Sequence, residues 1–185
     1  CLHIPAIARA AGVDIELELF DELSRSTPQI CLLDPAGTYM MEDFGWAGGV
    51  QAAMHVLRDK LLDNPTVGGK GSLQIAAEGE VSNADVIRDQ GNAYRPQGGI
   101  AVLRGNLCPD GAVIKQSAVS LEMRKFTGKA MCFDGEEDAM DAILAGKVAD
   151  GSFVIVRYAG PRGGPGMREM LGPTAALTGL SLIHI

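Results

Sequence analysis

Residues 153–171 read FVIVRYAGPRGGPGMREML, an apolar strand pattern that runs into a glycine- and proline-rich loop and then into a helix expected to begin near Met167. The first amides of a helix are unpaired, its dipole favours negative charge, and loop glycines let a ligand approach the backbone closely. The segment therefore predicts an anion-binding loop in an α/β protein. It has neither the Gly-Lys-Ser/Thr ending of a P-loop nor a complete Gly-x-Gly-x-x-Gly pattern, so the nucleotide-binding interpretations fail.

Glu169 is the acidic residue expected in the first turn of that helix. One interpretation is that its carboxylate only complements the helix N-terminus. The other is that it points into the pocket of the loop and binds a hard divalent cation through oxygen. A cation beside an anion-binding loop would suit a hydroxy-acid substrate, because the metal grips hydroxyl and carboxylate oxygens and acts as a Lewis acid. Spacing alone leaves both interpretations open.

The composition is that of a folded, acidic protein. The chain has 185 residues, of which 46% are apolar, 21% are charged and 24 are glycine, and its net charge is −7. This apolar content excludes a disordered chain, and the negative charge argues against nucleic acid as a partner. No apolar run approaches the roughly 20 residues that span a bilayer, and no signal-peptide pattern is present. We therefore expect no membrane partner and a cytoplasmic location.

The cysteine spacing argues against a local metal site. Cys1, Cys31, Cys108 and Cys132 form no Cys-x-x-Cys pair, whereas zinc and ferredoxin-type cluster sites usually take two ligands from one short segment. Cys31 and Cys132 lie in apolar runs and are expected to be buried strand residues, while Cys108 lies in a probable loop and is expected to be the most exposed thiol. This usage suits a reducing compartment better than a disulfide scaffold.

Helical patterns dominate the first third of the chain. Helices are predicted over residues 3–12, 17–23 and 40–62, the last with one apolar stripe at spacings of three and four. A buried strand is expected over residues 29–33, followed by a turn at residues 34–37.

The sequence pattern changes from helical to strand-like after the glycine-rich junction at residues 68–72. Short strand patterns follow at residues 100–103, 112–114, 129–133 and 153–158, with one helix at residues 136–145 that Asp134 is placed to cap. The first two strands and their turn suggest a hairpin-like connection; an alternative interpretation puts Asp110 or Lys115 at a ligand pocket. We expect domains at residues 1–68 and 69–180.

Two long segments carry a family resemblance. They are residues 98–115, GGIAVLRGNLCPDGAVIK, and residues 157–171, RYAGPRGGPGMREML; residues 2–8 and 133–139 agree with them. Together they resemble the dihydroxy-acid dehydratase and 6-phosphogluconate dehydratase family from residue 1 to about residue 180. The first segment is more similar to the dihydroxy-acid dehydratase branch, with sugar-acid dehydratases as close competitors.

The resemblance implies a fold and a reaction. The fold would be α/β: the end of an α/β catalytic domain followed by a β-rich, swivelling β/β/α domain of barrel-like form, truncated here. The reaction would be that of a hydro-lyase that dehydrates a 2,3-dihydroxy acid to a 2-keto acid in valine and isoleucine biosynthesis. Members of the family use Mg²⁺, an iron–sulfur cluster (2Fe-2S or 4Fe-4S) and a serine base, and the resemblance favours a homodimer. Glu169 matches the family's glutamate ligand to Mg²⁺, and Gly163, Gly164 and Gly166 become the candidate substrate-binding residues.

The sequence also departs from the family pattern. The family's cluster cysteines lie upstream of these residues and its serine base lies downstream in a Gly-Arg-Phe-Ser stretch, so none of the four cysteines is assigned as a ligand. Residues 181–185 leave the pattern and are expected to be a non-native tail. We therefore expect a fragment that is inactive alone. The alternative is a non-catalytic module that binds an anion or a metal through the loop at residues 160–166.

Overall fold

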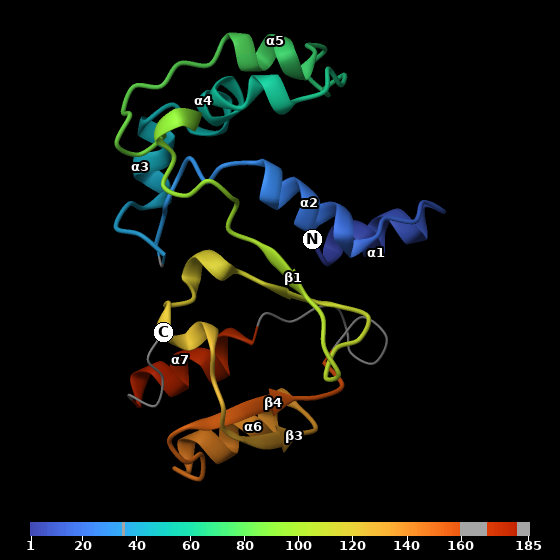
Figure 1. Cartoon of the computed structure of the whole chain (residues 1–185), viewed down its shortest axis with the longest axis vertical. Coiled ribbons are helices and arrows are strands. Elements are labelled where there is room, and N and C mark those ends of the chain that lie inside the picture. The colour runs from blue at the N-terminus through green and yellow to red at the C-terminus, as the bar shows by residue number, and fades with distance from the viewer. Residues whose placement is uncertain (35, 160–169, 181–185) are drawn as a thin grey trace. The chain divides into compact units, whose positions relative to one another are not determined.

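A computed structural model describes residues 1–34, 36–159 and 170–180 of the chain (Figure 1). The chain divides into two compact units, Cys1–Ala118 and Val119–Ile185, and each has its own core. The elements are mixed α/β with two small sheets, which agrees with the predicted α/β class. The domain boundaries expected at residues 68 and 180 stay predictions, and the tail at residues 181–185 lies outside the described residues.

The first unit is mainly helical. Its described helices and strands are α1 (His3–Ala10), α2 (Leu17–Ser26), α3 (Met41–Trp46), α4 (Gly49–Val56), α5 (Ser72–Ala77), β1 (Ala101–Leu103) and β2 (Ala112–Ile114), with short 3₁₀ turns at Arg58–Lys60, Gln90–Asn92 and Gln116–Ala118. The predicted helices 3–12 and 17–23 are confirmed as α1 and α2. Gly12, with φ of 79°, follows α1 as the expected glycine stop.

The single helix predicted over residues 40–62 is wrong. The chain forms α3 and α4 instead, and the break falls at Gly48 and Gly49, whose φ angles are 114° and 62°. A Cβ on Gly48 would overlap the backbone oxygen of Glu80 and would lie 2.6 Å from the Cβ of Ala52. The apolar stripe continues across the break because both helices pack on one core, which hides the interruption from the sequence pattern.

The strand predicted over residues 29–33 is also wrong. Gln29 and Leu33 make isolated bridges to two different segments, at Arg95 and Tyr39, so no continuous ladder forms. The apolar character of this stretch has another cause, which is that Ile30 is buried in the core of the unit. Beyond residue 68 the pattern also missed α5, which packs against α4.

The core of the first unit brings residues 30–87 together. Its buried members are Ile30, Ala47, Ala52, Val86 and Ile87. Val86 and Ile87 are each only 1% exposed. Small alanines on the helices share this core with the larger side chains, and the aromatic residues Tyr39 and Phe44 pack against it as partly buried neighbours.

The expected hairpin over residues 98–115 is confirmed. Strands β1 and β2 pair antiparallel, with Ala101 opposite Ile114 and Leu103 opposite Ala112. The free edge of β1 lies along helix α2, from which it is separated by about eighty residues of sequence (Figure 1).

The second unit is a β–α–β arrangement followed by a helix. It contains a 3₁₀ turn (Glu122–Arg124), β3 (Lys129–Phe133), α6 (Glu136–Leu144), β4 (Ser152–Val156) and α7 (Leu171–Gly179). Strands β3 and β4 are parallel and in register over five pairs, from Lys129 opposite Ser152 to Phe133 opposite Val156. The core consists of Ile143, Val148 and Leu177, and Met131, Phe133 and Val154 pack against it from the sheet. The strands and the helix predicted for this part of the chain are confirmed.

Two details of the second unit correct the sequence analysis. Gly135 is the N-cap of α6 and no side chain caps it, because Asp134 pairs with Arg157 instead. Cys132, expected to be buried, is exposed, whereas Cys108, expected to be the most exposed thiol, is only partly exposed, and Cys31 is partly buried. Cys132 alternates along β3 with Met131 and Phe133, which face the core, so its side chain lies on the opposite face. All four thiols are free.

Candidate functional site

The segment that the sequence singles out leaves the end of strand β4. Gly163, Gly164, Gly166 and Glu169 all belong to residues 160–169, which lie outside the described residues. The structure describes the residues on both sides of this segment, Arg157 and Tyr158 before it and Met170 after it. The described part of the candidate site therefore consists of these flanking residues.

Arg157 is held where the two parallel strands end. Its backbone amide donates to the carbonyl of Phe133 at 2.8 Å, and its Nε donates to Oδ1 of Asp134 at 2.7 Å. A second guanidinium nitrogen, Nη2, donates to the same oxygen. These hydrogen bonds and the charge of Asp134 raise the pKa of Arg157 above its ordinary value. The end of β4 thus carries an Arg157–Asp134 ion pair directly before the glycine-rich segment in the sequence, at the carboxyl edge where open α/β sheets place their ligands.

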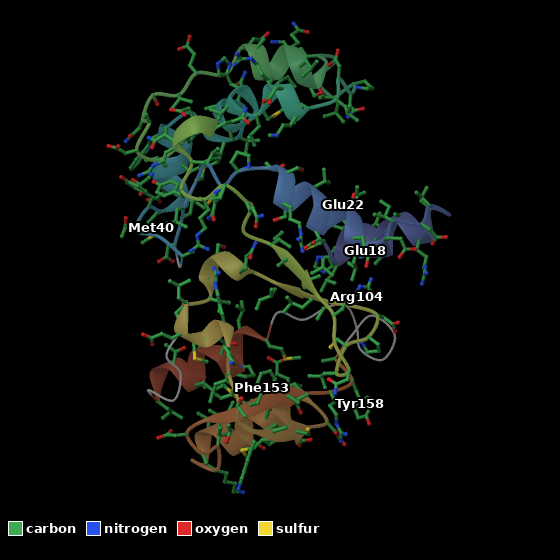
Figure 2. The ribbon with its side chains drawn as sticks, viewed as in Figure 1. Glu18, Glu22, Met40, Arg104, Phe153 and Tyr158 are labelled. Atoms are coloured by element: carbon green, nitrogen blue, oxygen red, sulfur yellow. The ribbon has the colours of Figure 1, made fainter. Side chains whose placement is uncertain are left out.

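Strained backbone flanks the segment on both sides. Among the described residues, Tyr158 and Met170 are the two non-glycine residues in the left-handed region, with φ of 58° and 54°. This conformation costs an L-residue roughly 1–2 kcal/mol, so the surrounding structure must impose it. Such strain concentrates at ligand-binding segments, which makes the coincidence with residues 160–169 informative. Figure 2 shows Tyr158 at the exit of β4, where the Arg157 guanidinium carbon lies 5.3 Å from the centre of its ring.

Helix α7 follows the glycine-rich segment. It spans Leu171–Gly179 with Met170 as its N-cap, while the start expected near Met167 lies outside the described residues. The hydroxyl of Thr174 donates to the carbonyl of Met170 at 2.9 Å and so ties the first turn to the cap. Leu177 then anchors the helix in the core of the second unit.

The second segment of interest, residues 98–115, forms the β1–β2 hairpin. Asp110 lies in its turn and Lys115 directly follows β2, and both are exposed. Arg104 closes the turn by donating from Nη1 to the carbonyl of Pro109 at 2.9 Å. Because strand β2 separates Asp110 from Lys115, the structure does not bring them together, and nothing in the hairpin supports them as ligands of one pocket.

The described residues offer no complete metal site. Within residues 1–34, 36–159 and 170–180, no group of three or more His, Cys, Asp or Glu side chains is placed to hold a metal ion. These described residues therefore provide no set of side chains that fits an iron–sulfur cluster. Glu169 is an oxygen donor of the type that Mg²⁺ takes, although it lies outside this part of the chain.

The structure also shows a charged hollow that the sequence analysis missed. It has a volume of about 480 Å³ and lies between α2 and β1 within the first unit. Figure 2 shows Glu18 and Glu22 on the helix and Arg104 beyond the strand. The hollow is lined by Glu18, Asp21, Glu22, Arg25, Val102 and Arg104. Only the Asp21–Arg25 spacing of four residues was visible in the sequence; the contacts to β1 bridge about eighty residues and leave no local pattern.

Asp21 is the best-defined carboxylate of this hollow. Its Oδ1 accepts a hydrogen bond from the backbone amide of Val102 at 3.0 Å, and its Oδ2 accepts from Nε of Arg25 at 2.6 Å. The bond from Val102 and then the bond from Arg25 hold the pKa of Asp21 below its ordinary value of 3.8. Both oxygens of this carboxylate thus already accept hydrogen bonds from within the protein.

No described helix has the combination of length and apolar character required to cross a membrane.

Comparison with known proteins assigns the family. The N-terminal domain described as "Dihydroxy-acid/6-phosphogluconate dehydratase N-terminal" matches residues 1–75, and the C-terminal domain of the same description matches residues 85–184. The chain belongs to the dihydroxy-acid/6-phosphogluconate dehydratase family, as its motifs indicated.

Individual relatives agree with this assignment. The chain is 54% identical over 181 residues to a dihydroxy-acid dehydratase of Thermodesulfovibrio yellowstonii and 52% identical to one of Syntrophotalea carbinolica. It is also 54% identical to a dihydroxy-acid dehydratase of Geobacter sulfurreducens. Each alignment covers 98% of this chain but 33% of the relative, so the chain spans about a third of the length of the proteins it matches.

Proposed function

We propose that this chain is part of a hydro-lyase that removes water from a 2,3-dihydroxy carboxylic acid to give a 2-keto acid, as in valine and isoleucine biosynthesis. The observation that carries the proposal is the match to both domains of the dehydratase family, together with 54% identity to a dihydroxy-acid dehydratase along 98% of the chain. The relatives reported above are all named dihydroxy-acid dehydratase, which favours this substrate class over a sugar acid. Since the chain spans about a third of such a protein, we expect the isolated chain to be inactive.

The proposed site is the glycine-rich segment between β4 and α7. Gly163, Gly164 and Gly166 would let the substrate carboxylate approach the backbone, and Glu169 would provide an oxygen ligand to Mg²⁺. When bound, Mg²⁺ supplies Lewis-acid polarisation of substrate oxygens. The iron–sulfur cluster and the serine base belong, in this proposal, to other parts of the longer enzyme.

The described residues would position that segment. Arg157, paired with Asp134, fixes the end of β4 on one side of the segment. Met170, tied to Thr174, fixes the start of α7 on the far side of the segment. Both ends of the segment are thereby held before a ligand binds, which lowers the ordering cost of binding.

Three further features belong to the same proposal. The second unit would be part of a swivelling, barrel-like domain in the complete enzyme, and that enzyme would be a homodimer. Its location would be the cytoplasm, where the four free thiols would stay reduced.

A chimeric enzyme tests the proposal. Residues 1–180 of this chain replace the aligned segment of the Thermodesulfovibrio yellowstonii enzyme, and formation of 2-keto acid is measured with a branched-chain 2,3-dihydroxy acid and with gluconate. We expect turnover of the branched-chain acid, and a large loss of turnover in the Glu169→Gln variant. Glu137→Gln is the matched control, because Glu137 is an exposed carboxylate at the start of α6.

A second chimera controls for grafting itself. It carries the aligned segment of the Geobacter sulfurreducens relative, which is 54% identical to this chain. If that chimera turns over and the first one folds without activity, the dehydratase proposal is wrong. One carboxylate provides too few ligands for a tight Mg²⁺ site. Tight binding of Mg²⁺ by the isolated 185-residue chain would therefore mean that the chain forms a site of its own, and it would favour the binding-module alternative.

A further inference from the structure

Among the described residues, strand β1 pairs with β2 on one edge and with no strand on the other. In an antiparallel pair, alternate residues turn their backbone groups toward the partner and away from it. Because the amide of Val102 donates to Asp21, the outward-facing residues of this edge are Val102 and, two residues earlier, Ile100. An exposed edge of this kind is a site for unwanted strand pairing unless another element covers it.

Helix α2 covers that edge with side chains in place of a strand. Asp21 accepts from the amide of Val102 at 3.0 Å, and the hydroxyl of Ser24 donates to the carbonyl of Ile100 at 2.6 Å. The carbonyl of Ser24 also accepts from the amide of Gly98 at 2.7 Å. Asp21 and Ser24 are three residues apart and so lie on one face of the helix. The strand positions that they contact, 98, 100 and 102, are alternate positions whose backbone groups point away from β2.

Gly98 is shaped for this contact. A Cβ at this position would lie 2.7 Å from the Ser24 hydroxyl oxygen and 3.2 Å from the Ser24 carbonyl oxygen. Only a residue without a side chain lets the strand approach the helix this closely. The glycine is thus explained by the helix contact, independently of the hydrogen bonds.

Two ion pairs brace the same contact. Arg25 holds the second oxygen of Asp21 at 2.6 Å, which fixes the orientation of the carboxylate toward the strand. Glu18 pairs with Arg104, which follows β1 directly. Both pairs are partly exposed, so we assign them an orienting role and not a large share of the stability.

We propose that α2 locks the β1–β2 hairpin to the N-terminal domain of the family, with Asp21 and Ser24 as the positioning residues. Helix α2 lies in the N-terminal family domain, residues 1–75, whereas the hairpin lies in the C-terminal family domain, residues 85–184. The compact unit Cys1–Ala118 crosses this boundary and keeps the hairpin with the helix. The two family domains are therefore joined by a specific side-chain lock in addition to the linking chain. This inference goes beyond the proposed activity and does not depend on it.

Amide hydrogen exchange in the full 185-residue chain tests the lock. In the Asp21→Ala variant, the Val102 amide is expected to exchange at least about fivefold faster, since it loses a hydrogen bond worth about 1 kcal/mol or more. The amides of the paired residues Ala101 and Leu103 report whether the hairpin itself survives. Glu22→Gln is the matched control, because Glu22 lies beside Asp21 on α2 and is exposed.

Two further variants separate the lock from general unfolding. Asp21→Asn keeps an oxygen acceptor and should restore most of the protection of Val102, whereas Gly98→Ala should accelerate exchange at Val102 with every polar group of the lock intact. Unchanged exchange at Val102 in both Asp21→Ala and Gly98→Ala would overturn the proposal. Equal acceleration in Asp21→Asn and Asp21→Ala would also overturn it, since the acceptor oxygen would then have no role.

Discussion

Ile143 anchors the second unit, and replacing it with alanine should loosen that unit alone. The side chain is 0% exposed and packs with Val148 and Leu177 in a small core. The substitution removes the Cγ1, Cγ2 and Cδ1 carbons, which at about 0.8 kcal/mol each amounts to a transfer loss of about 2.4 kcal/mol. The cavity left behind brings the expected loss of unfolding free energy to about 2–5 kcal/mol.

This loss is large relative to the stability of the unit. A unit of the size of Val119–Ile185 has about 3–10 kcal/mol of stability in total. Hydrogen exchange by mass spectrometry should therefore show amides of β3 and β4 exchanging between about 30-fold and a few thousandfold faster in Ile143→Ala. The neighbouring Leu144, which is 64% exposed, provides the control variant Leu144→Ala.

The same experiment tests whether the two units are separate. Amides of α4, in the first unit, should keep their exchange rates in Ile143→Ala, because α4 packs in a different core. Exchange in β3 and β4 that changes by less than about threefold would refute the packing argument. Equal acceleration in α4 would refute the division into two units.

Three other perturbations have defined outcomes. Gly48→Ala should destabilise the first unit by more than about 1 kcal/mol in urea unfolding, because the φ of Gly48 is 114° and a Cβ there would overlap the backbone of Glu80. Gly45→Ala, with open space around it, should be neutral or stabilising, and equal effects of the two substitutions would contradict the steric explanation. The contribution of Asp21 to the free energy of unfolding should be fully present above its ordinary pKa of 3.8 and should be lost as the pH falls through its lowered folded pKa, because the Val102 amide and Arg25 stabilise the charged form. Acid titration of the Val102 amide signal measures this loss, and a loss that begins at neutral pH would point to another group. Burial raises the pKa of Cys31 to about 11, so at pH 8 about one Cys31 thiol in a thousand is ionised. Iodoacetamide should therefore modify the exposed Cys132 long before Cys31, as followed by peptide mapping, and the reverse order would contradict the structure.

Local patterns in the sequence predict much of the fold. The helices α1 and α2, the β1–β2 hairpin and the order β3–α6–β4 all follow from apolar periodicity and turn residues within about fifteen positions. These signals survive because each element satisfies its own backbone hydrogen bonds or pairs with a near neighbour.

The errors arise where distant residues decide the local structure. The helix over residues 40–62 breaks at Gly48 because the backbone of Glu80 lies against it, and the stretch 29–33 lacks a partner strand despite its apolar pattern. Asp134 has the expected position of a cap but meets Arg157, which is 23 residues away. None of these partners is visible in a local window of sequence.

The candidate site depends on resemblance more than on periodicity. Spacing alone left Glu169 between a dipole-complementing role and a metal ligand, and the family motif favours the ligand. The structure adds what spacing could not supply, namely the left-handed residues Tyr158 and Met170 and the anchored Arg157 on the borders of the segment. The lock between α2 and β1 depends on geometry across about eighty residues and had no counterpart in the sequence analysis.

The most direct test of the proposed role is a magnesium titration of the chimeric enzyme. The rate of 2-keto acid formation is measured against Mg²⁺ concentration for the parent chimera and for its Glu169→Gln and Glu137→Gln variants. Glu169→Gln is expected to raise the half-saturating Mg²⁺ concentration at least about tenfold, as loss of a metal-site group does, and Glu137→Gln is expected to leave it unchanged. A Glu169→Gln chimera with the Mg²⁺ dependence of the parent would contradict the assignment of this glutamate as a metal ligand.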